Sequence, residues 1–136
     1  MDLEHLEREG LPSPERKDAV MGRTHTVNFY GCEVAEYKMP SQAQLDSFIK
    51  MVEFKIDGES KLHRGKEGPQ FYHAGLLESH LHIDWWPDRS NGLQITLHYC
   101  NYSRDNADRA RMLLELMRGY FKPTKIFEHN AQEVPM

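Results

Sequence analysis

Two stretches in the middle of the chain alternate apolar and polar side chains with a period of two. In residues 79–86 the apolar positions are Leu81, Ile83 and Trp85, and in residues 93–100 they are Leu93, Ile95, Leu97 and Tyr99. Alternation of this kind predicts strands with one buried face. A slip of one residue would move every apolar side chain to the wrong face, so the pattern also fixes the parity of the pairing.

The remaining segments predict a mixed fold around this hairpin. Residues 24–32 and 71–77 are β-rich runs, a short extended piece reaches Arg64, and residues 124–128 form a last strand. Ser41 is a suitable N-cap for a helix that we expect to end near Gly58, with Leu45, Phe48, Ile49 and Val52 at helical spacing. Asp105 or Asn106 opens a second helix, which Pro123 ends and whose apolar stripe is Ala110, Leu113, Leu114, Met117 and Phe121.

The order of these elements is β-α-β-β-β-α-β. This order predicts an α+β two-layer sandwich, with two helices on one face of a mostly antiparallel sheet. We place the domain at residues 22–130. Residues 1–21 are polar and carry Gly10, Pro12 and Pro14, so we expect an N-terminal arm there, and residues 131–136 are expected to be a C-terminal tail.

Composition limits the classes of partner. The net charge is -4 and the Lys and Arg residues are scattered, so the sequence shows no basic patch for nucleic acid. No apolar run reaches the length of a membrane span, and the charged start is not that of a signal peptide. Cys32 and Cys100 form no CxxC pair. We therefore expect a reduced, cytoplasmic protein that binds neither nucleic acid nor membrane.

The polar face of the central hairpin is rich in titratable groups. Alternation places these side chains on it: His80, His82, Asp84, Thr96, His98 and Cys100. Three interpretations are open: a solvated or subunit-contact face, a metal site in which His80, His82 and His98 supply three imidazoles, or an enzyme active site. The run His80-Leu81-His82-Ile83-Asp84 is also similar to the HxHxDH string of metallo-β-lactamase-like hydrolases, but Trp85 replaces the last histidine.

The active-site interpretation comes from a resemblance. Residues 77–87, LESHLHIDWWP, resemble the self-cleavage motif of prokaryotic S-adenosylmethionine decarboxylases, which are small, self-processing pyruvoyl enzymes of spermidine synthesis. Further similar pieces follow the family's order: Gly22-Arg23 before Phe29-Tyr30-Gly31-Cys32, the pair His63-Arg64, Cys100 at the end of the next strand, and Ile126-Phe127-Glu128-His129. On these motifs the chain is identified as a divergent member over residues 22–130.

The resemblance implies a decarboxylase that makes its cofactor from its own chain. The bond between Glu78 and Ser79 would be cut, and Ser79 would become a pyruvoyl group, the electron sink for decarboxylation. Cys100 corresponds to the cysteine that protonates the product. The substrate-binding candidates are Trp86, which corresponds to an adenine-stacking residue, Asp88, which corresponds to a ribose-binding carboxylate, and His80. Because the family dimerises, the resemblance implies a homodimer or higher homo-oligomer acting on a small molecule.

Three positions differ from the family's pattern. Asp84 stands where the family has a histidine that assists self-processing, Phe71 where it has a processing serine, and Gly65 where it has a second adenine-stacking aromatic residue. His82 or His73 is a candidate for the missing imidazole, and Asp84 is itself a catalytic candidate. The alternative functions are an unprocessed binding or regulatory homologue, another S-adenosylmethionine-using enzyme, or a decarboxylase of ornithine or arginine.

Overall fold

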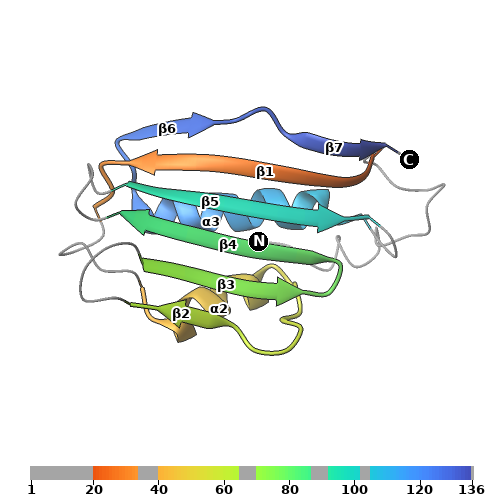
Figure 1. Ribbon diagram of the computed structural model, residues 1–136, viewed down its shortest axis with the longest axis horizontal. Coiled ribbons are helices and arrows are strands. Elements are labelled where there is room, and N and C mark those ends of the chain that lie inside the picture. The colour runs from red at the N-terminus through yellow and green to blue at the C-terminus, as the bar shows by residue number, and fades with distance from the viewer. Residues whose placement is uncertain (1–19, 34–39, 65–69, 87–91, 102–104, 136) are drawn as a thin grey trace.

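The computed structural model describes residues 20–33, 40–64, 70–86, 92–101 and 105–135. In this part of the chain a seven-stranded antiparallel sheet has the order β2-β3-β4-β5-β1-β6, and β7 pairs with β1 beside β6 (Figure 1). The strands are β1 (Val20–Tyr30), β2 (Lys61–His63), β3 (Gln70–Leu76), β4 (Ser79–Trp86), β5 (Gly92–Cys100), β6 (Lys125–Glu128) and β7 (Gln132–Pro135). Residues 1–19, the greater part of the expected N-terminal arm, lie outside the described residues.

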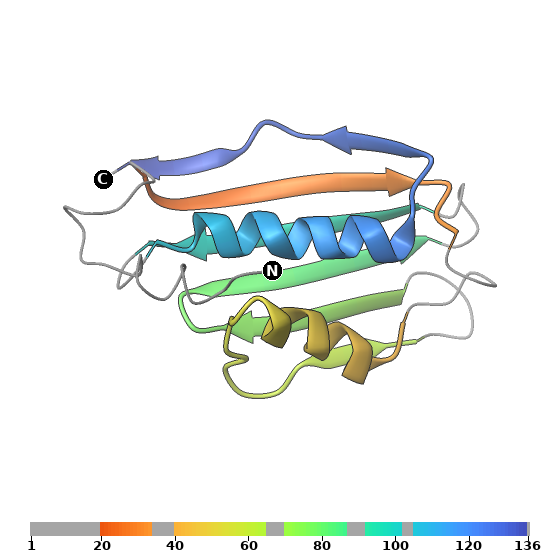
Figure 2. The same ribbon diagram turned by 180° about the vertical axis from the view of Figure 1, so that it is seen from behind.

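Both helices, α2 (Gln42–Met51) and α3 (Ala107–Phe121), lie on the same face of the sheet. In Figure 2 α3 crosses the middle of the sheet and α2 lies in front of β2 and β3. This confirms the predicted α+β two-layer sandwich. Neither helix has the length and apolar content needed to span a bilayer, and the described residues contain no other helix that does.

The pairing of β4 with β5 builds the centre of the core. Leu81 lies opposite Leu97 and Ile83 opposite Ile95, and these four side chains are fully buried. From α3, Leu113 and Met117 are also fully buried and belong to the same cluster. The predicted parity of the hairpin is therefore confirmed, because the apolar sides of both strands face the helices.

Local sequence sets the ends of α2. The Ser41 hydroxyl accepts a hydrogen bond from the Gln44 backbone N–H, and the Gln44 side chain accepts one from the Ser41 N–H, which together form a capping box. The expectation that this helix ends near Gly58 is wrong, since the helix stops at Met51. Glu53, at a φ of 62°, turns the chain back, and Ile56 then bridges to Leu76 at the end of β3.

A buried arginine joins the two helices. The Arg109 side chain is fully buried in α3, with Nη2 3.8 Å from a carboxylate oxygen of Glu53 and Nη1 3.4 Å from the Asp105 carbonyl. Glu53 follows α2 and Asp105 precedes α3. The guanidinium therefore links the end of one helix to the beginning of the other, and its burial makes removal of one partner costly.

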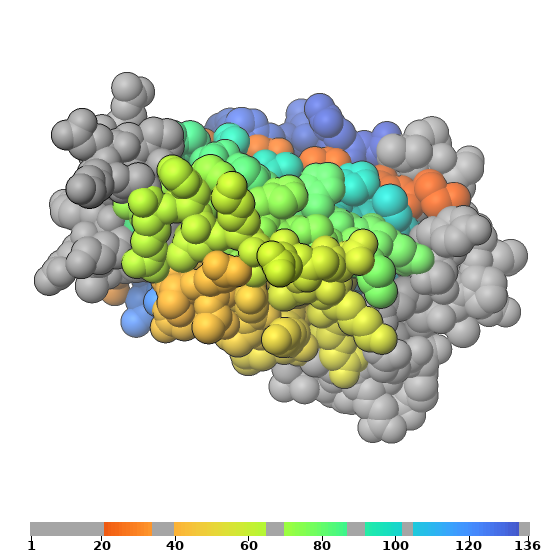
Figure 3. Space-filling view, turned by 60° about the horizontal axis from the view of Figure 1, so that its bottom comes forward, coloured from red at the N-terminus to blue at the C-terminus, as the bar shows by residue number. Residues whose placement is uncertain are grey.

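The two edges of the sheet differ. At one edge α2 and the three-residue strand β2 lie together, as Figure 3 shows from the side of this edge. At the other edge β6 and β7 share the outer side of β1. The sequence did not predict β7, which falls where a tail was expected, and β1 begins at Val20, before the expected domain start at residue 22.

Two glycines give a matched test of this fold. Gly31, at a φ of 62° after β1, lies against Thr124, so a Cβ there would clash with the Thr124 side chain. Gly119, within α3, has open space around it. We predict that Gly31→Ala lowers the free energy of unfolding by about 2 kcal/mol or more. In contrast, Gly119→Ala should raise it by about 1 kcal/mol through helix propensity.

Urea denaturation of both variants beside the wild type measures these changes. Equal effects of the two substitutions would contradict the conformation and packing assigned to Gly31.

Candidate active site

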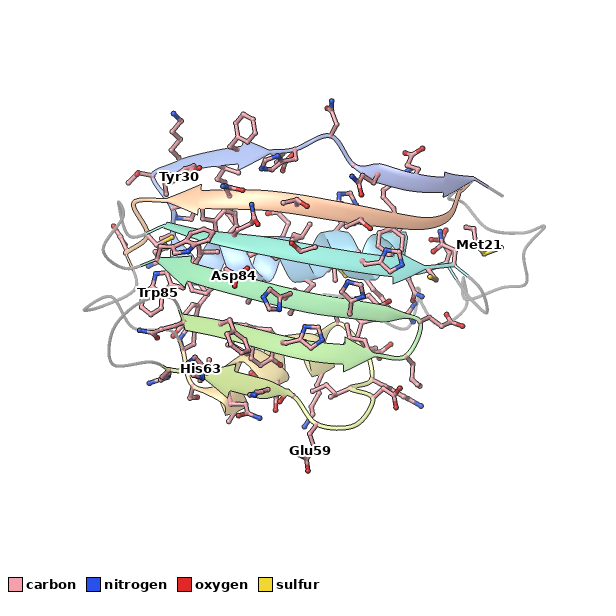
Figure 4. All side chains as sticks on the ribbon, in the orientation of Figure 1. Met21, Tyr30, Glu59, His63, Asp84 and Trp85 are labelled. Carbon is pink, nitrogen blue, oxygen red and sulfur yellow. The ribbon has the colours of Figure 1, made fainter. Side chains whose placement is uncertain are left out.

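The face of the sheet away from the helices, here called the open face, carries the polar side chains of the hairpin (Figure 4). His98 on β5 lies opposite His80 on β4 and opposite Thr24 on β1. Two residues further along β4, His82 lies opposite Thr96. Asp84, with Gln94 opposite, and Cys100 at the end of β5 complete the set, so the six side chains predicted to share a face do so.

Rings from neighbouring strands stack across the open face. The Phe71 ring lies between His63 and His82, with centroid distances of 5.1 Å and 5.7 Å. His80 lies between His73 and His98, at 6.2 Å and 5.1 Å. Paired strands are spaced about 4.8 Å apart, which suits rings standing side by side on one face. Phe71 and the histidines thus form a ring array, namely His63, Phe71, His73, His80, His82 and His98.

The ring array is not arranged as a metal site. His82 Nε2 lies 3.1 Å from a carboxylate oxygen of Asp84, and His82 Nδ1 lies 3.2 Å from Nδ1 of His73. Each nitrogen of His82 is thus engaged by a neighbouring side chain. Among the described residues, no group of three or more His, Cys, Asp or Glu side chains is placed to hold a metal ion. The arrangement does not support the three-imidazole interpretation of His80, His82 and His98.

The peptide between Glu78 and Ser79 sits in the turn from β3 to β4. Glu78 has a φ of 65°, a left-handed conformation that costs a non-glycine residue on the order of 1 kcal/mol or more. Its carbonyl oxygen accepts a hydrogen bond of 2.7 Å from the backbone N–H of Cys100. The fold thus holds the expected cleavage peptide against the end of β5 by a direct backbone contact.

The Asn106 side chain forms hydrogen bonds on both sides of the contact between Glu78 and Cys100. Its side chain is fully buried and donates to the Cys100 carbonyl at 2.8 Å and to a carboxylate oxygen of Glu78 at 3.4 Å. Sequence reasoning assigned Asn106 only to the beginning of a helix, and its side chain makes no capping hydrogen bond. The residue instead joins the turn at Glu78 to the end of β5, a contact that the sequence alone does not predict.

The Ser79 hydroxyl lies apart from the imidazoles. Ser79 falls in the alternation with Leu81 and Ile83, whereas His80 and His82 face the open side. The Ser79 Oγ atom is buried and has no hydrogen-bond partner among the described residues. His82, a candidate for the missing imidazole, contacts His73 and Asp84 instead. The peptide before this hydroxyl is contacted by the Cys100 N–H at the Glu78 carbonyl, and Asn106 contacts the Glu78 side chain.

The predicted site residues divide between the two ends of β4. Glu78, Ser79, His80 and Cys100 gather at the end where Asn101 donates to the Met21 carbonyl, while Trp86 occupies the other end. In Figure 4, Asp84 lies toward the end marked by Tyr30 and Trp85, away from Met21. Asp88 and Gly65 lie outside the described residues. At about 3.4 Å per residue, Ser79 and Trp86 are on the order of 24 Å apart.

Burial and neighbouring charges shift the pKa values of two groups near the turn at Glu78, namely Cys100 and His80. Burial, together with the Glu78 carboxylate, raises the pKa of the Cys100 thiol, so the thiol keeps its proton at neutral pH. Burial, followed by the charges of His98, His73 and His82, lowers the pKa of His80. The other cysteine, Cys32, is part of the hydrophobic core, and burial raises its pKa to about 11.

No protein-family model matches the sequence, and no curated protein matches it either. The fold is similar to that of a solved structure, the adenosylmethionine decarboxylase of Aquifex aeolicus, with a TM-score of 0.72. The match has 13% sequence identity and covers 88% of this chain and 94% of that chain. Nearly the whole of both chains thus shares one fold.

The lowered pKa of His80 makes stability depend on pH. Because the pKa of His80 is lowered in the folded state, the unfolded chain binds more protons as the pH falls below the ordinary histidine value of about 6.5. We predict that the free energy of unfolding decreases between about pH 7 and about pH 5. His80→Gln, which removes this group, should give a shallower decrease.

Urea denaturation at several pH values checks this. His129→Gln, which removes an exposed imidazole outside the ring array, is the matched control and should keep the wild-type slope. Identical slopes for wild type and His80→Gln would show that His80 does not carry the effect.

Proposed function

We propose that this chain is a self-processing, pyruvoyl-dependent decarboxylase of the S-adenosylmethionine decarboxylase type, with Ser79 as the pyruvoyl precursor. The observation that carries the proposal is the state of the peptide between Glu78 and Ser79. Glu78 has a left-handed φ of 65°, its carbonyl accepts from Cys100 N–H at 2.7 Å, and the following hydroxyl has no hydrogen-bond partner among the described residues. The sequence motif and the shared fold support the same assignment.

This geometry favours an acyl shift from nitrogen to oxygen. The Ser79 Oγ atom attacks the Glu78 carbonyl carbon, the hydroxyl proton passes to the departing nitrogen, and an ester replaces the peptide bond. Negative charge develops on the Glu78 oxygen, where the Cys100 N–H already donates, so the transition state is stabilised by a group in place. The left-handed conformation of Glu78 raises the energy of the starting peptide.

Elimination then completes the maturation. The ester bond between Ser79 Cβ and oxygen breaks as the Cα proton is removed, which releases the Glu78 carboxylate. Water replaces the nitrogen of the resulting dehydroalanine, ammonia leaves, and residue 79 becomes a pyruvoyl group. Position 79 fits this group, because it is the first residue of β4 and would become the free end of that strand.

The pyruvoyl group supplies a carbonyl that binds the substrate amine and takes up the electrons of the broken carbon–carboxylate bond. The chain's own contribution is a proton donor, for which Cys100 is the candidate. Its thiol stays protonated at neutral pH, since burial and Glu78 raise its pKa. Asn106, through the Cys100 carbonyl, holds this end of β5 against the cleavage turn.

The distance along β4 calls for a second chain. If Trp86 binds the adenosine of the substrate, it cannot do so at Ser79 of its own chain, because about 24 Å separates the ends of β4. Two copies that pack through their open faces with β4 reversed would bring Trp86 of one chain to the end of β4 at which Ser79 lies in the other. We therefore propose a homodimer whose two sites each use both chains.

A second candidate is an unprocessed binding homologue, and one pair of residues favours it. Phe71 and Asp84 lie directly opposite each other on β3 and β4, at the positions where the resembling family has serine and histidine. Phe71 is stacked against His63 and His82, and Asp84 pairs with His82. These side chains are engaged with the ring array and are not directed to the cleavage peptide.

Intact-mass measurement separates the two candidates. We predict that the purified protein contains two pieces, residues 1–78 and a piece that begins with a pyruvoyl group at position 79. Ser79→Ala removes the attacking oxygen and should remain a single chain of 16.0 kDa. A wild-type protein that stays uncut after long incubation would refute self-processing and favour the unprocessed homologue.

The shared site can be tested by mixing variants. Ser79→Ala and Trp86→Ala, each alone, should lack decarboxylase activity on S-adenosylmethionine. Co-expression should restore about one quarter of the wild-type activity, because about half of the dimers are mixed and each mixed dimer has one complete site. Co-expression without any recovery would contradict the two-chain site, and sedimentation of the mixture would show whether dimers had formed.

A further inference from the structure

A row of hydrogen bonds leads from β1 to the Cys100 thiol. The Thr24 hydroxyl lies 2.8 Å from His98 Nδ1, and His98 Nε2 lies 3.4 Å from Cys100 Sγ. Thr24 and His98 are directly opposite each other in the pairing of β1 with β5, and Cys100 shares the open face with His98. Nothing in the motif that the chain shares with the decarboxylases includes Thr24 or His98.

We propose that His98 is a positioning residue for Cys100. Held by Thr24, it donates from Nε2 to the sulfur and leaves the hydrogen of the thiol free for the substrate. The use of this contact in catalysis rests on the proposed function, but the contact itself does not.

The tautomer follows from the two partners of the ring. A neutral imidazole carries one N–H, and the partner of one nitrogen decides where it sits. If Thr24 donates to Nδ1, the proton of His98 is on Nε2 and points at the sulfur. In the opposite tautomer Nε2 would accept the thiol hydrogen, and Cys100 would have none to give. Only the first arrangement is compatible with a proton donor at Cys100.

The surroundings of the Cys100 sulfur favour a hydrogen-bond donor beside it. Burial and the Glu78 carboxylate both disfavour a thiolate at Cys100. On β5 the titratable neighbour is His98, and on β4 it is His80, whose ring stacks on His98 at 5.1 Å. β1 contributes Gly22 and Thr24, which carry no charge. The N–H of His98 is therefore the group that stabilises negative charge developing on Sγ.

Gly22 leaves one side of the thiol open. A Cβ at Gly22 would lie 3.6 Å from Cys100 Sγ and 3.5 Å from His98 Cε1, so any side chain there would cover both. The sulfur is thus braced by His98 and still approachable from the open face.

The proton that Cys100 gives to the substrate is replaced, through His98 and Thr24, by a proton from water. When Cys100 gives its proton to the substrate carbon, Nε2 of His98 passes its own proton to the sulfur. Nδ1 takes the proton of the Thr24 hydroxyl, and Thr24, which is half-buried, takes one from water. The imidazole ends neutral in its other tautomer, and exchange with water restores the first.

Alkylation of Cys100 tests the inference without any need for cleavage or turnover. The purified chain is treated with iodoacetamide at pH values from about 6 to about 10, and peptide-resolved mass spectrometry separates Cys100 from the buried Cys32. His98→Leu removes the donor, so we predict that alkylation at about pH 8 slows about tenfold and its midpoint moves to higher pH. His98→Gln keeps an N–H near the Nε2 position and should stay within about threefold of the wild type.

Matched variants exclude a general structural effect. Thr24→Val should shift the midpoint in the same direction as His98→Leu, whereas Thr24→Ser, which keeps the hydroxyl, should not. His73→Leu removes another ring of the ring array that does not contact the sulfur, and it should leave the midpoint unchanged. An unshifted midpoint in His98→Leu, or equal behaviour of His98→Leu and His98→Gln, would overturn the role of His98.

The outcome is distinguishable from that of the proposed function. A chain that stays uncut but shows the predicted shift would refute the decarboxylase and retain the contact between His98 and Cys100. In a chain that matures, the pH dependence of kcat should follow the alkylation midpoints of the His98 variants.

Discussion

In the centre of the sheet, Leu81 lies opposite Leu97 and Ile83 opposite Ile95, and all four side chains are buried in one core cluster with Leu113 and Met117 of α3. The rest of the molecule depends on this register. Since side chains alternate along a strand, burying this face of β4 and β5 leaves His80, His82, His98 and Cys100 on the other. The hydrophobic effect, acting on one side of the hairpin, thus assembles the polar groups on the opposite side.

The same register brings the turn between β3 and β4, which contains Glu78, to the end of β5. β4 begins at Ser79 and β5 ends at Cys100, so the pairing places the Glu78 carbonyl within 2.7 Å of the Cys100 N–H. One backbone hydrogen bond therefore joins the turn at Glu78 to the end of β5, and the carbonyl that accepts it is the one attacked in the proposed reaction. The buried amide of Asn106 fixes that contact from the helix side.

The ring array places several imidazoles within stacking distance on the open face. Phe71 and Asp84 belong to this region and lie opposite each other across β3 and β4. The fold is similar to that of an adenosylmethionine decarboxylase at 13% sequence identity.

Local patterns determined much of this protein. Alternation in residues 79–86 and 93–100 predicted both strands and the face of each side chain, and Ser41 marked the beginning of α2, because these features depend on neighbouring residues alone. Tertiary structure decided the rest. Four residues, Gln132–Pro135, become a strand only because β1 offers a partner. Asn106 contacts Glu78, which lies 28 residues away in the chain, and Thr24 contacts His98, which lies 74 residues away. Such contacts form only when two separate segments pack together, and the periodicity of side chains within one segment does not predict them.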